Sequence, residues 1–86
     1  MLKLAELKIL PIPERSEYVL ANGQYLHYRI QGWCKIDLYL LRDEQNNSYY
    51  AELWYYYDLK SIGLVRVFKT APSFEPYIEN IKFRLT

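Results

Sequence analysis

The aromatic side chains of residues 49–59 are the part of this chain best equipped to bind something. The segment, YYAELWYYYDL, holds one Trp and five of the ten Tyr. Successive side chains of a strand point to opposite faces. One face then suits a core and carries Tyr49, Ala51, Leu53, Tyr55, Tyr57 and Leu59. The other places carboxylates, which require water, beside large rings, and carries Tyr50, Glu52, Trp54, Tyr56 and Asp58. Rings on a water-facing side predict a docking surface.

Neighbouring segments predict which side chains complete this surface. A two-residue turn at Asn46-Asn47 pairs residues 35–43 with residues 49–59, which sets Tyr39 opposite Trp54 and leaves Ile36, Leu38 and Leu40 facing the core. A six-residue loop would shift this register by two and keep the same faces. If Val65 and Val67 of the strand 64–70 point inward, Arg66 and Phe68 lie outside. The predicted binding residues are Trp54, Tyr56, Tyr39, Tyr50, Phe68 and Arg66, with a polar rim of Lys35, Asp37, Glu52 and Asp58.

The chain's own ends provide the alternative use of this surface. Phe74, Tyr77 and Phe83 are large enough to cover the rings, because small curved sheets often bury parts of both faces. Residues 74–85 fit either a helical stripe or a short turn followed by a closing strand, and we favour the strand.

Other chemistry finds little support in the sequence. Zinc requires three or four ligands of the His and Cys type, and the chain has one histidine, His27, and one cysteine, Cys34. By alternation Cys34 joins the core face as an inert thiol. The carboxylates are scattered and fit a solvated rim better than a catalytic pair. We therefore expect no enzyme, no metal and no cofactor.

Turn residues predict the remaining elements. Asn22-Gly23 favours a type I′ turn between strands 18–21 and 24–30, with Leu26, Tyr28 and Ile30 on one face and Tyr25, His27 and Arg29 on the other. Gly32-Trp33 separates this hairpin from the strand 35–43. Pro11 and Pro13 are expected to stop any N-terminal helix.

Composition limits the class of protein. Eighty-six residues make one domain, 1–86, and 51% hydrophobic content is enough for a core. A net charge of +1 supplies no basic field for nucleic acid. A single cysteine points to a reducing cytoplasm, and no apolar run approaches the length of a membrane span.

The sequence therefore predicts an all-β fold of five to seven strands built from consecutive hairpins. It would be a small, strongly curved antiparallel sheet or a small barrel of SH3-like or OB-like size, or else a five-stranded open sheet that dimerises. We expect it to bind another protein, or a second copy, through its aromatic face or a free edge, as an accessory or adaptor domain. Binding of single-stranded nucleic acid or a saccharide to the same rings is the alternative.

Overall fold

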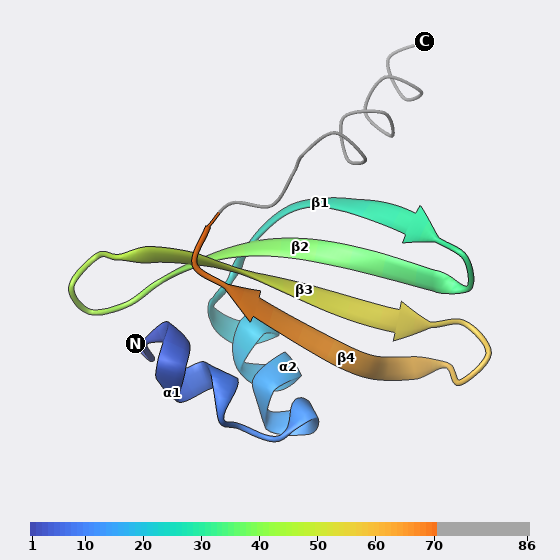
Figure 1. Cartoon of the computed structure of the whole chain (residues 1–86), viewed down its shortest axis with the longest axis horizontal. Helices are drawn as coiled ribbons and strands as arrows, with labels where there is room; N and C mark the ends of the chain where they lie inside the picture. The colour runs from blue at the N-terminus through green and yellow to red at the C-terminus, as the bar shows by residue number, and fades with distance from the viewer. Residues whose placement is uncertain (71–86) are drawn as a thin grey trace, which may run out of the picture.

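The structure is a four-stranded antiparallel sheet with two short helices on one of its faces (Figure 1). The computed structural model describes residues 1–70. Within this range the sheet is open and its strands lie in chain order. The elements are α1 (Leu4–Lys8), α2 (Ile12–Asn22), β1 (Gln24–Gln31), β2 (Cys34–Arg42), β3 (Ser48–Tyr56) and β4 (Ser61–Phe68).

The main core lies between the sheet and the helices. Leu7 of α1 and Val19 of α2 are fully buried against alternate residues of three strands. Those strand residues are Leu41, Tyr49, Ala51, Leu53, Val65 and Val67. The alternation predicted for residues 49–53 is thus confirmed. Val65 and Val67 point inward, which decides the direction that the sequence left open. We call this side of the sheet the helix face and the other side the open face.

The prediction of five to seven strands and strong curvature is wrong for residues 1–70. The first error is the hairpin at Asn22-Gly23, because residues 18–21 belong to α2. Pro11 and Pro13 lie at the N-terminal end of α2, where a proline loses no helical hydrogen bond and its fixed φ favours the helix. A Cβ on Gly23 would lie 2.7 Å from the Val19 carbonyl oxygen, so this glycine permits the close exit from α2 into β1. The predicted closing strand, residues 74–85, lies outside the described residues.

The second error is the register between β2 and β3. The loop between them has five residues, 43–47, and the strands pair Leu38 with Glu52 and Ile36 with Trp54. The observed register differs from the predicted one by three residues. A shift by an odd number of residues moves the side chains of one strand to the opposite face of the sheet. As a result, Ile36 and Leu38 lie on the open face, and Tyr39 lies on the helix face.

The Asp43 side chain explains the five-residue loop. Its Oδ1 accepts hydrogen bonds from the backbone N–H groups of Gln45 and Asn47, both at 2.9 Å. These bonds, that of Asn47 first, hold the pKa of Asp43 below its ordinary value. Asn46 takes the left-handed conformation at φ 64°, whereas the prediction placed both asparagines at the turn. Asp43 therefore closes a longer loop than the asparagine pair would.

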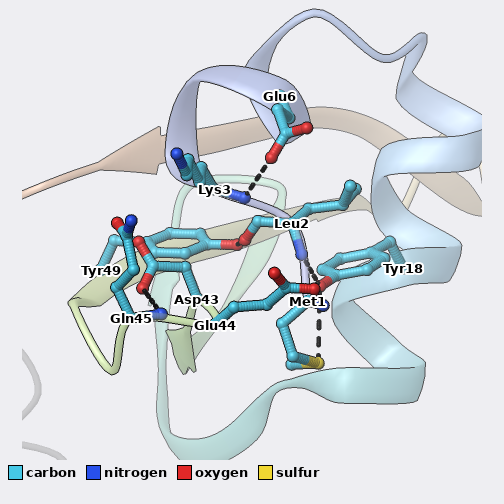
Figure 2. A network of polar contacts seen from close by, with 9 residues as sticks. All are labelled: Met1, Leu2, Lys3, Glu6, Tyr18, Asp43, Glu44, Gln45 and Tyr49. Carbon is cyan, nitrogen blue, oxygen red and sulfur yellow. Dashed lines mark hydrogen bonds and ion pairs between the residues drawn. The ribbon is translucent and has the colours of Figure 1, made fainter.

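Two tyrosine hydroxyls fix the N-terminal segment (Figure 2). The backbone N–H of Leu2 donates to the Tyr18 hydroxyl, and the Tyr49 hydroxyl donates to the Leu2 carbonyl, each at 2.8 Å. The Met1 ammonium lies 3.4 Å from the Glu44 carboxylate. The segment before α1 is thereby tied to α2, to β3 and to the β2–β3 loop.

We expect stability to fall at high pH because of Tyr49. Burial, with the nearby Tyr18 hydroxyl as the next cause, raises the pKa of Tyr49 to about 12 from 10.0. Its contribution is therefore complete below pH 10 and is lost as the pH rises toward 12, because the unfolded chain ionises first. The wild type should lose about 2 kcal/mol more across this window than Tyr49→Phe does in urea unfolding. Equal losses in both proteins would contradict the assignment.

Candidate functional site

The open face gathers five of the six predicted binding residues. Tyr50, Trp54 and Tyr56 alternate along β3, and the register sets Phe68 beside Tyr50 and Arg66 beside Glu52. Tyr39 is the exception, because the odd register shift places it on the helix face. There it packs edge-to-face on Tyr25, with ring centroids 5.6 Å apart. Burial first, and then the Asp37 charge, raise the pKa of Tyr39.

A buried carboxylate occupies the centre of the open face. Glu52 is 3% exposed. Its Oε1 accepts a hydrogen bond from the Trp54 indole N–H at 3.1 Å, and Oε2 lies 3.6 Å from an Arg29 nitrogen. An Arg66 nitrogen lies 3.9 Å from Oε1. A buried charge requires such partners, so Glu52 holds the side chains of three strands in place.

The Arg29 side chain crosses the open face of the sheet from β1 to β3. It starts on the edge strand β1, opposite Ile36 of β2, and reaches Glu52 on β3. Its guanidinium carbon lies 5.5 Å from the centroid of the Trp54 ring, a cation–π distance. Because β2 lies between β1 and β3, the Arg29 side chain must pass over β2. This explains why Ile36 and Leu38 are fully buried although both described helices lie on the other face.

The remaining rings border this centre, and all of them are half-buried. Tyr50 and Phe68 stack, with centroids 6.4 Å apart and planes inclined by 17°. The Tyr56 ring lies against Gly63, where an added Cβ would come within 2.7 Å of it. Leu64 lies beside Trp54 on β4. The surface is therefore formed by rings and guanidinium groups above an aliphatic floor.

Both edges of the sheet are interrupted. On the β4 edge, the Arg15 guanidinium of α2 donates to the Val65 carbonyl at 2.8 Å. On β1, an irregularity in the pairing lies between Tyr25 and His27. It moves Tyr25 to the face of Tyr28 and Ile30, whereas the sequence predicted the opposite face. A bulge, or a carbonyl oxygen that already accepts a hydrogen bond, discourages the addition of another strand at a sheet edge. The open face is therefore a better candidate binding site than either edge.

The other reactive residues lie where they serve the fold. Cys34 is buried on the face of Ile36 and Leu38, as alternation predicted, but this is the open face and not the face of the main core. His27 lies beside Leu38, and its ring centroid is 5.3 Å from that of Tyr28, with the two ring planes inclined by 45°. Within residues 1–70, no three His, Cys, Asp or Glu side chains come together as a metal site requires. In the same range, no helix is long and apolar enough to cross a membrane.

Sequence reasoning missed the roles of Arg29 and Glu52. It placed Glu52 in a polar rim, whereas the structure buries it at the centre. The signal was available, because Glu52 is a lone carboxylate between Ala51 and Leu53 in an otherwise apolar strand. Such a group requires a cation nearby, and the sheet order supplies Arg29 from β1, two strands away.

Comparison with protein-family models, with curated proteins and with solved structures gives no match for this chain.

Proposed function

We propose that this domain is a non-catalytic accessory or adaptor module that binds protein through its open sheet face. The partner is another protein or a second copy of the chain. The single observation that carries the proposal is the arrangement of Trp54, Tyr56, Tyr50, Phe68 and Arg66 around the buried Glu52. Trp, Tyr and Arg are the residue types that contribute most of the binding energy at protein interfaces.

Preorganisation supports this proposal. Trp54 is held by its bond to Glu52 and by the guanidinium of Arg29. An anchor that is already fixed loses little conformational entropy on binding, so more of its contact energy appears as affinity. Arg66 differs from Arg29 because its side chain is 57% exposed. A partner can reach this cation, which would pair with a carboxylate of the partner.

The balance of charge favours protein over nucleic acid. Two arginines face one carboxylate at the centre of the surface, so the excess is a single positive charge. Affinity for single strands rests on several phosphate contacts, with stacking as an addition. Nucleic acid and saccharide remain the alternative ligands of the same rings. The lone Cys34 fits the cytoplasmic location that we propose.

The experiment compares variants of the open face with a matched control elsewhere. Arg66→Ala and Phe68→Ser alter the open face, and Leu59→Ser removes an exposed apolar side chain in the β3–β4 turn. Purified chains are studied by sedimentation equilibrium, and tagged chains are recovered from native lysate. We expect self-association or partner recovery to fall about tenfold or more in both face variants. Leu59→Ser should behave as the wild type.

Two results would overturn the proposal. One is a wild-type chain that neither self-associates nor retains a protein partner. The other is recovery of nucleic acid, with an affinity that falls steeply as the salt concentration rises. That result would make nucleic acid, and not protein, the ligand of the open face. Circular dichroism of each variant confirms that the fold is intact before binding is compared.

A further inference from the structure

A pocket lies on the helix face, apart from the aromatic surface. Beside α2, the sheet and the helix leave a pocket of about 280 Å³. Its walls are Leu20 of α2, Leu53 and Tyr55 of β3, Tyr57 of the β3–β4 turn, and Ile62 of β4. At roughly 30 Å³ per water molecule, this volume equals about nine waters. It is therefore large enough for a compound of about ten non-hydrogen atoms.

Two opposite charges accompany these apolar walls. Lys35 and Asp37, two residues apart on β2, also line the pocket. The Lys35 ammonium lies 3.6 Å from Asp37 Oδ1, which is longer than the roughly 2.7–2.9 Å of a charge-assisted hydrogen bond. Oδ1 is shielded from solvent and has no hydrogen-bond donor among the described residues. The Asp37 side chain is 22% exposed as a whole, so a ligand can reach its carboxylate only at the other oxygen, Oδ2.

The combination selects a chemical class of ligand. An apolar pocket selects an apolar body, and its few polar groups fix the orientation. Here those groups are one ammonium and one carboxylate on neighbouring positions of the same strand face. An α-amino acid carries the complementary pair on a single carbon atom, next to its side chain.

We propose that this pocket binds a free α-amino acid with an apolar side chain, such as leucine or phenylalanine. The ligand's ammonium group pairs with Oδ2 of Asp37, and its carboxylate pairs with Lys35. Its side chain enters the space between Leu20, Tyr55 and Ile62. The Tyr28 ring, 5.2 Å from the Lys35 ammonium, helps to hold that cation in place. This site is separate from the protein-binding face, because Lys35 and Asp37 lie on the helix face.

The test is a titration of the isotope-labelled full chain with L-phenylalanine and L-leucine, followed by NMR. Amide shifts should appear at Leu20, Tyr55 and Ile62 and saturate with a Kd of about 1 mM or below. L-Phenylalaninamide lacks the carboxylate and 3-phenylpropionate lacks the ammonium. Each should bind about tenfold or more weakly.

Variants separate the charges from the apolar walls. Lys35→Gln and Asp37→Asn should each weaken phenylalanine binding about tenfold, whereas Lys60→Gln, outside the pocket, should leave it unchanged. Leu20→Ser, at an exposed helix position, should weaken binding without unfolding the chain. No shift at pocket residues up to the solubility limit of phenylalanine would overturn the proposal. Equal affinity for phenylalanine and its two analogues would also overturn it.

Discussion

Replacing Glu52 with leucine is expected to lower the free energy of unfolding by about 3–5 kcal/mol. The substitution leaves Arg29, whose side chain is 16% exposed, without the carboxylate that its guanidinium contacts at 3.6 Å. It also removes the acceptor of the Trp54 indole N–H. For a domain of this size, such a loss is a large part of the total stability. Urea unfolding monitored by circular dichroism measures it.

A double substitution tests whether the loss comes from the buried charge. Arg29→Met combined with Glu52→Leu removes both members of the pair and should recover most of the lost stability, because a buried pair often exchanges for apolar groups at little net cost. Glu52→Gln keeps the size and the acceptor and should cost about 1–2 kcal/mol. Glu17→Gln, on the exposed side of α2, is the matched control and should change little. A Glu52→Leu effect as small as that control would contradict the burial of the cluster.

The second large effect is expected at Arg15. Its guanidinium donates to the carbonyl oxygens of Lys8 and Leu10, each at 2.7 Å from Nη2, and to that of Val65 at 2.8 Å. It therefore links the end of α1, the connection to α2 and the edge strand β4. Arg15→Met should lower the free energy of unfolding by about 2–4 kcal/mol, because hydrogen bonds from a charged donor are lost. Urea unfolding again measures the change.

Geometry, rather than charge alone, should account for the Arg15 effect. Arg15→Lys keeps the charge but lacks the planar guanidinium that reaches several acceptors. It should therefore retain less than half of the stability that Arg15→Met loses. Arg42→Met removes an exposed arginine at the end of β2 and should stay within about 0.5 kcal/mol of the wild type. Full rescue by lysine would show that the three carbonyl contacts contribute little.

The sequence predicted much of the sheet and little of the N-terminal part. Local patterns in residues 24–30, 35–43, 49–59 and 64–70 located β1 to β4. The bounds differ most in the last two strands, because β3 ends at Tyr56 and β4 begins at Ser61, three residues earlier than predicted. The α2 helix was missed because Asn22-Gly23 marks both a type I′ turn and a helix end. The packing of Val19 against the sheet, which local sequence does not contain, decides in favour of the helix.

The candidate site shows the same division between local and tertiary information. The alternation of Tyr50, Trp54 and Tyr56 was enough to place them on one face. The face of Tyr39 depended on the register across the loop 43–47, where the Asp43 side chain selects five residues. The ion pair between Arg29 and Glu52 spans three strands, so it can be predicted only once the strand order is known.

The most direct test of the protein-binding surface is site-specific photocrosslinking. A photoreactive analogue of phenylalanine is placed at position 68 on the open face, or at position 17 on the outer side of α2 as control. Both chains are irradiated in native lysate and, separately, after purification. We expect a protein adduct, or a crosslinked dimer, from position 68 that is absent from position 17 and reduced by Arg66→Ala. Equal crosslinking from both positions, or no protein adduct from position 68, would contradict it.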